Sequence, residues 1–235
     1  MLNAIPNKVS LADLHRYLPK DVRKLIYAKL DTCDIKLILK AHGSKELIMT
    51  VELSIHCAKN GHLELLKWAR TNGCPWDVYS CYYAARYGHL KVLKYLHDNE
   101  LPWGAIVCTE AAMNDHLEVL KYLHVNGCPW DASACSFAAG NGRLEILKYL
   151  HVNGCPWDTR ACTCAAENGR LEVLKYLHVN GCPWDTRACS FAAGNGRLEV
   201  LKYLRDNKCP WDKSECVKYA TENNHQHIID WLNVN

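Results

Sequence analysis

Residues 185–211 read DTRACSFAAGNGRLEVLKYLRDNKCPW. Asp185 suits a helix N-cap, because its carboxylate can accept hydrogen bonds from the free N–H groups of the first turn. A short helix is predicted over 186–193, and the Asn195-Gly196 pair is a turn signal, since glycine readily adopts positive φ. Small residues recur on one face of this segment and allow a neighbouring helix to approach closely. They are Cys189, Ala192, Ala193 and Gly196.

A second helix is predicted over 197–206. Its apolar side consists of Leu198, Val200, Leu201 and Leu204. In the preceding copy, Gly181 is placed to end the corresponding helix as a left-handed C-cap, and Pro183 prevents its continuation. Trp184 is expected to pack over this junction. One pair of antiparallel helices cannot bury its own apolar faces, so the pairs must stack on one another.

The stretch is one copy of a tandem repeat with a period of 27 residues. Its Pro-Trp pair recurs with tryptophan at Trp76, Trp103, Trp130, Trp157, Trp184 and Trp211. We expect a non-repetitive segment over 1–49 and a repeat domain over 50–235. The seven repeats are 50–76, 77–103, 104–130, 131–157, 158–184, 185–211 and 212–235. The last repeat is more polar, as an end cap should be, and its inter-helix turn is expected to be one residue longer.

The segment 188–204 resembles the core of an ankyrin repeat, through its Ala-Ala pair, its glycine turn and its Leu-Glu-Val run. This resemblance extends from about Leu53 to the C-terminus. The period is shorter than the 33 residues of ordinary ankyrin repeats, and the missing residues fall where those repeats project a β-hairpin finger. The resemblance implies an all-α, ankyrin-like solenoid of helix-turn-helix repeats with short loops. Near-identical units containing tryptophan are similar to ankyrin proteins of large DNA viruses and protists.

The segment 18–35, LPKDVRKLIYAKLDTCDI, resembles the start of an F-box. The residues that carry the resemblance are Leu18, Pro19, Val22, Leu25, Ile26 and Leu30. An F-box implies docking to the Skp-type adaptor of a cullin-RING ubiquitin ligase, with the repeats holding a target protein. A degenerate N-terminal capping repeat would also need two amphipathic helices, so both interpretations stay open.

Composition excludes several classes of function. The net charge is +3, with 28 basic and 25 acidic residues spread along the chain, which argues against a nucleic-acid-binding face. No run approaches the roughly 18 apolar residues of a membrane span. The N-terminus shows no basic region followed by an apolar run, so we expect no secretory leader. We therefore predict a monomeric protein of the cytoplasm, or of cytoplasm and nucleus, in a virus-infected host cell if the viral resemblance holds.

Eleven of the 14 cysteines and four of the 12 histidines follow the repeat. One cysteine series is Cys74, Cys128, Cys155, Cys182 and Cys209, and the other is Cys81, Cys108, Cys135, Cys162, Cys189 and Cys216. Neighbours in a series are one repeat apart, too far for shared zinc ligands, so we predict small buried hydrophobic residues and no metal. The histidine series is His97, His124, His151 and His178, with Arg70 and Arg205 at the flanking positions. Arginine is not a zinc ligand, so the shared property is basicity near a helix C-terminus.

No catalytic set of residues and no cofactor motif stands out from the repeat, and we predict a protein-binding module rather than an enzyme. A stand-alone scaffold or masking protein without a ligase link is the alternative. In ankyrin repeats the first helix lines the concave binding face. The residues predicted to point outward from it are Tyr79, Tyr82, Tyr83, Arg86, Ile106, Glu110, Met113, Phe137, Arg160, Glu167, Arg187 and Phe191. Exposed tyrosine and arginine are typical of interface hot spots.

Overall fold

A computed structural model describes residues 51–71 and 73–234 of the chain. These residues form fourteen helices, arranged as antiparallel pairs, and no strand. The first helices of the pairs are α4 (Val51–Asn60), α6 (Val78–Arg86), α8 (Ala105–Met113), α10 (Ala132–Gly140), α12 (Thr159–Glu167), α14 (Thr186–Gly194) and α16 (Lys213–Glu222). The second helices are α5 (Leu63–Thr71), α7 (Leu90–Asp98), α9 (Leu117–Val125), α11 (Leu144–Val152), α13 (Leu171–Val179), α15 (Leu198–Asp206) and α17 (Gln226–Val234). The prediction of an all-α array with short loops in place of hairpin fingers is confirmed.

The chain divides into two compact units between Pro102 and Trp103. The first unit contains α4–α7, and the second contains α8–α17. The predicted F-box-like residues, from Leu18 to Leu30, lie outside the described residues.

Local sequence signals set the ends of the helices. Asp185 adopts an extended conformation and accepts a hydrogen bond from the Arg187 N–H at 3.0 Å, as an N-cap does. Gly181 has φ +77°, and its N–H donates to the carbonyl oxygen of His178 at 3.0 Å. This left-handed residue ends α13 as predicted. Gly196 has φ +70° and lies in the turn between α14 and α15, so it is not part of the small-residue face of the helix.

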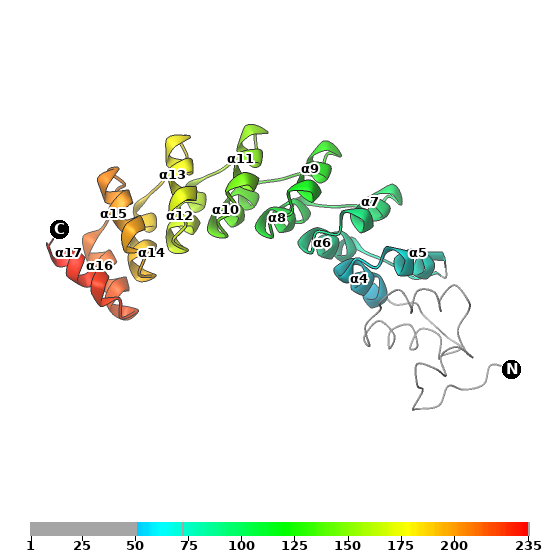
Figure 1. Cartoon of the computed structure of the whole chain (residues 1–235), viewed down its shortest axis with the longest axis horizontal. Coiled ribbons are helices and arrows are strands. Elements are labelled where there is room, and N and C mark those ends of the chain that lie inside the picture. The colour runs from blue at the N-terminus through cyan, green and yellow to red at the C-terminus, as the bar shows by residue number, and fades with distance from the viewer. Residues whose placement is uncertain (1–50, 72, 235) are drawn as a thin grey trace, which may run out of the picture. The chain divides into compact units, whose positions relative to one another are not determined.

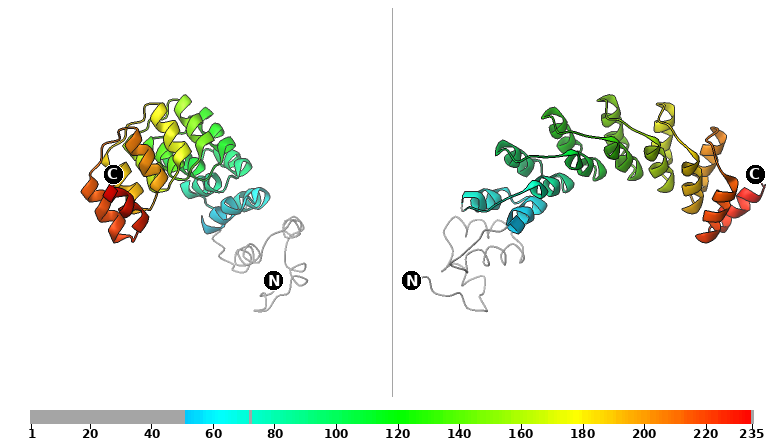
Figure 2. Two further views of the ribbon diagram at one scale, coloured as in Figure 1. Left: turned by 60° about the vertical axis from the view of Figure 1, so that its left-hand side comes forward. Right: turned by 180° about the vertical axis from the view of Figure 1, so that it is seen from behind.

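Small residues make close helix packing possible in the second unit. Cys189, Ala192 and Ala193 are fully buried, and the first helices α8, α10, α12, α14 and α16 pack against one another in sequence. The second helices mainly contact the first helix of their own pair. The two rows of helices are visible in Figures 1 and 2. Because the first helices pack more closely than the second, this unit curves with its first helices on the inside.

Two helical glycines allow close approach between first helices of the second unit. A Cβ atom at Gly140 would lie 3.2 Å from Cβ of Cys164, and one at Gly194 would lie 3.0 Å from Cβ of Tyr219. Such distances are too short for ordinary side-chain contact, so a glycine allows the next helix to approach at each position.

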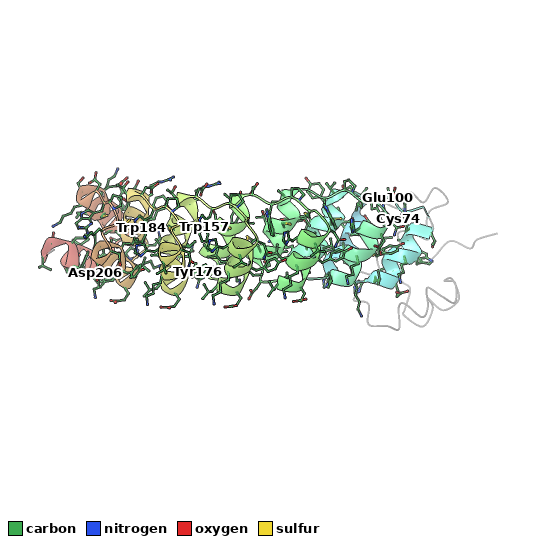
Figure 3. All side chains as sticks on the ribbon, turned by 90° about the horizontal axis from the view of Figure 1, so that it is seen from above. Cys74, Glu100, Trp157, Tyr176, Trp184 and Asp206 are labelled. Atoms are coloured by element: carbon green, nitrogen blue, oxygen red, sulfur yellow. The ribbon has the colours of Figure 1, made fainter. Side chains whose placement is uncertain are left out.

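An aromatic ladder joins the second helices. The ring of His178 stacks on Trp184 at 4.0 Å, and its Nδ1 lies 2.9 Å from Tyr203 Oη in the following repeat. The same contacts recur around His124 and His151, and Figure 3 shows Trp157 and Trp184 at corresponding places along the unit. The predicted packing role of the tryptophans is therefore confirmed.

The same stacking position explains why arginine replaces histidine at two places in the series. The Arg205 guanidinium lies 3.9 Å from the Trp211 ring centroid, and the Arg70 guanidinium lies 4.4 Å from that of Trp76. Both cations cover a tryptophan face, a favourable cation–π arrangement. These two arginines therefore pack on a tryptophan ring in addition to placing a positive charge near a helix end.

The two cysteine series are buried, as predicted, and they meet in pairs 20 residues apart. Cys209 donates to the carbonyl oxygen of Asp185 at 3.6 Å, which ties the connecting loop to the N-cap of the same repeat. A hydrogen bond to the Cys209 thiol, and then burial, raises the pKa of Cys189 well above its usual range. Leu101 takes the place of a cysteine and is likewise buried. These thiols fill the core of the repeats.

The last repeat differs from the expected form. The sequence predicted a longer inter-helix turn, but the extra residue lies in α16, which has ten residues where the other first helices of the second unit have nine. Asn224 adopts the positive φ of +59° at the place of the turn glycine. The longer helix shifts the register of α16 by one residue, so Tyr219 rather than Lys218 faces Gly194.

Replacing Asp185 by alanine should lower the free energy of unfolding by about 1 kcal/mol at pH 7 through loss of the N-cap. The Arg187 side chain, hydrogen-bonded to Asp185, holds the pKa of that carboxyl below its usual value. The Asp185 carboxylate therefore contributes fully to the free energy of unfolding above its pKa in the unfolded chain, about 3.9. This contribution is lost as the pH falls through the lower pKa of Asp185 in the folded protein. Urea titrations at several pH values measure the difference. The exposed Asp206→Ala control should change stability little, and a loss for Asp185→Ala that persists at pH 2 would contradict this account.

Candidate protein-binding surface

The outward face of α6 carries a cluster of tyrosines in the first unit. The rings of Tyr82 and Tyr83 meet edge to face at 5.0 Å, and Arg86 Nη1 donates to Tyr82 Oη at 2.8 Å. Tyr79 is 57% exposed at the start of the helix. The predicted site residues of this repeat are thus brought together on one helix face. Sequence reasoning missed Tyr87, which stacks on Tyr83 at 6.4 Å and extends the cluster beyond the helix end.

In the second unit, the predicted residues differ in exposure. Ile106, Phe137, Arg160 and Arg187 are exposed, and Met113, Glu167 and Phe191 are half-buried. Glu110 departs from the expected outward orientation, because it is only 6% exposed and lies 3.4 Å from the Asn114 amide nitrogen. The Glu110 carboxylate is therefore not accessible to a binding partner.

The two arginines at the start of α12 and α14 are oriented by the N-cap carboxylates. Arg187 Nη2 lies 2.7 Å from Asp185 Oδ2 and donates to Thr159 Oγ1 at 2.9 Å. Arg160 pairs with Asp158 at 3.0 Å in the same way. Both arginine side chains stay more than half exposed and therefore accessible to solvent.

A depression of about 270 Å³ lies on the outward face of α12, α14 and α16. Its lining residues are Glu167, Ser190, Phe191, Gly194, Asn195, Tyr219 and Asn223. Two of them, Glu167 and Phe191, were predicted as site residues. The others were missed, because Ser190 and the asparagines recur as ordinary repeat positions and Tyr219 follows a change of register in α16.

Cys164 is the one described cysteine that is half-buried, and it lies on this face where neighbouring repeats carry phenylalanine. In a Cys33→Ser background we expect a thiol reagent to modify Cys164 at least about 100-fold faster than the other thiols, which need local unfolding. Burial and then the Glu167 carboxylate raise the pKa of Cys164, so the rate should climb with pH above the usual range for cysteine. Mass spectrometry of Cys164→Ser should show no fast phase. A second fast thiol from residues 51–71 or 73–234 would contradict the packing.

The described residues show no group of three or more histidine, cysteine, aspartate or glutamate side chains that could hold a metal ion. Within the same residues, no helix combines the length and the apolar character needed to cross a membrane. The arrangement is instead that of a helical repeat protein with a regular core and a variable outward face.

Comparison with known proteins identifies these repeats. Residues 108–185 match the family described as ankyrin repeats (3 copies), and residues 81–124 match ankyrin repeats (many copies). Both matches lie within residues 81–185, where the chain is similar to ankyrin repeats, a class of protein-interaction module. It is similar in structure to the human ASB11 ankyrin repeat domain, with a TM-score of 0.57 and 20% sequence identity over 66% of this chain and 83% of that one. No curated protein sequence matches the chain significantly.

Proposed function

We propose that the outward face of the first helices binds a target protein. The observation that carries this proposal is the exposure of large apolar side chains on these helices, with Tyr79 57%, Ile106 53% and Phe137 47% exposed. The remaining positions of the same helices are mostly small and buried. Exposed aromatic side chains on a rigid scaffold are favourable anchors for a protein partner.

Proximity labelling with the full chain would identify the partner, and variants would then locate its binding site. We expect Phe137→Ala and Tyr79→Ala each to weaken binding by about tenfold or more, since aromatic anchors commonly contribute above 1 kcal/mol. Val152→Ala is the matched control, because Val152 is 80% exposed but lies on a second helix. Weaker binding by Val152→Ala, together with no effect of Phe137→Ala, would place binding on the face of the second helices.

We further propose that the bound target is linked to a cullin-RING ubiquitin ligase through the N-terminal segment. The support is the F-box-like sequence from Leu18 to Leu30. Pull-down with a Skp-type adaptor should retain the wild-type chain and lose the Leu18→Ala and Pro19→Ala variants. Absence of wild-type binding would leave the alternative of a stand-alone scaffold or masking protein.

The expected site of action is the cytoplasm, or cytoplasm and nucleus, including that of a virus-infected cell. Its support is the sequence: the cysteines follow the repeat as core positions, and free thiols are typical of a reducing compartment. We propose that the protein acts there as a monomer.

A further inference from the structure

The depression on α12, α14 and α16 has two aromatic walls. The rings of Phe191 and Tyr219 lie 6.4 Å apart with their planes inclined by 45°. Gly194, which allows Tyr219 to approach α14 closely, also lines the depression. Aromatic faces carry negative potential and attract cations.

Several of its other groups offer hydrogen-bond acceptors. The Glu167 carboxylate is half-buried and makes no hydrogen bond or ion pair with any residue in 51–71 and 73–234. The amide nitrogens of Asn195 and Asn223 donate to the carbonyl oxygens of Phe191 and Tyr219 at 2.9 and 3.0 Å. Their Oδ1 atoms are left as acceptors, so the lining combines one carboxylate with amide oxygens and aromatic faces.

Three helices also end at this place. Glu167 is the last residue of α12, Gly194 is the last residue of α14, and Asn223 is the C-cap of α16. The C-terminal end of a helix carries partial negative charge from its unpaired carbonyl groups. The electrostatic environment therefore favours a positively charged group.

Two cations of the chain lie near the depression without neutralising its carboxylate. Arg197 Nε donates to the main-chain carbonyl oxygen of Glu167 at 3.2 Å, and Lys218 Nζ lies 5.9 Å from the Tyr219 ring centroid. Neither forms an ion pair with the Glu167 side chain among the interactions of the described residues. The carboxylate thus remains available for a cation from outside.

The corresponding surface at α10, two repeats earlier, lacks the carboxylate and the second aromatic ring. Phe137 and Gly140 correspond to Phe191 and Gly194. Met113 stands in place of Glu167, and Cys164 faces the glycine where Tyr219 does in the later repeats. The carboxylate and the second ring are therefore specific to the depression and are not general features of the repeat.

We propose that this depression binds an arginine side chain of the partner protein, an inference that rests on the proposed binding role of the first-helix face. A planar guanidinium can stack on an aromatic ring while donating two hydrogen bonds to one carboxylate. Its weaker hydration lowers the cost of entry compared with the ammonium of lysine. The acceptors Asn195 and Asn223 can take the remaining guanidinium N–H groups.

The test uses the full chain and N-acetyl-L-arginine methylamide as the probe. NMR titration should show saturable shifts of the Phe191 and Tyr219 ring signals, with a dissociation constant on the order of millimolar. The citrulline analogue has a similar shape without charge and should bind at least about tenfold more weakly, and the lysine analogue should lie between them. Glu167→Gln should weaken arginine binding about tenfold, and Glu172→Gln, on a second helix, should leave it unchanged.

Equal binding of the citrulline analogue, equal shifts of the Phe137 ring, or an unaffected Glu167→Gln variant would each overturn the proposal. If the arginine probe fails to bind while Phe137→Ala still weakens partner capture, the proposal falls and the proposed function stands. If the probe binds but no first-helix variant affects partner capture, the proposed function falls, and the assignment of a partner's arginine falls with it.

Discussion

Replacing Leu174 by alanine is expected to lower the free energy of unfolding by about 2–5 kcal/mol. Leu174 is fully buried in α13, which packs against the first helix of its own repeat. Truncation removes apolar contacts and leaves a cavity that the regular packing on both sides cannot close. Urea unfolding followed by tryptophan fluorescence measures the loss.

Val179 provides the matched control for this prediction, because it lies on the same helix and is 80% exposed. Val179→Ala should change stability by no more than about 0.5 kcal/mol. The result to look for is a large difference between the two variants. Similar losses would mean that α13 does not bury the face formed by Val173, Leu174 and Leu177.

Replacing Ala166 by leucine should cost about 1–3 kcal/mol for the opposite reason. Ala166 is fully buried in α12, where successive first helices approach closely across small side chains. A leucine requires these helices to separate or side chains to leave their preferred rotamers. Because the helices also carry the outward face, the variant should weaken partner binding as well as stability.

Ala132→Leu is the control for the larger side chain, since Ala132 is half-buried at the first position of α10. We expect little change in its urea midpoint. An Ala166→Leu protein as stable as the wild type would show that the face of small residues tolerates larger side chains. The small residues on this face would then reflect duplication of the repeat rather than a packing requirement.

The sequence was sufficient to predict the helix pairs because their signals are local. Asp185 caps its own helix, and Gly181 ends the preceding one in the left-handed conformation. The 27-residue period then repeats these signals, so one correctly interpreted copy describes the others. Burial of Leu201 and Ala193 follows from helical periodicity in the same way.

Features that depend on the distance between repeats were beyond sequence reasoning. Contacts within one repeat can also be hidden, because the pairing of Cys189 with Cys209 joins residues of two separate series. The stacking of His178 on Trp184, with a hydrogen bond to Tyr203, involves two repeats. A fixed offset in sequence does not reveal which side chains touch, because that depends on the rise and rotation from one repeat to the next.

The candidate surface was predictable only in part for the same reason. Phe191 and Glu167 could be placed on an outward face from helical periodicity. The contribution of Tyr219 depends on the additional residue in α16, which the sequence alone assigned to the turn. The burial of Glu110 depends on its surroundings in space, which a position within the repeat does not determine.

The repetition of the same contacts at successive junctions has a consequence for how such a protein can change. Each His-Trp-Tyr contact and each cysteine pair is nearly the same from one junction to the next within the second unit. Recombination between two gene copies, in register by one period, would therefore join compatible surfaces and yield a folded chain of different length. The outward residues would then appear in a new order, so new binding specificities can arise without redesign of the core.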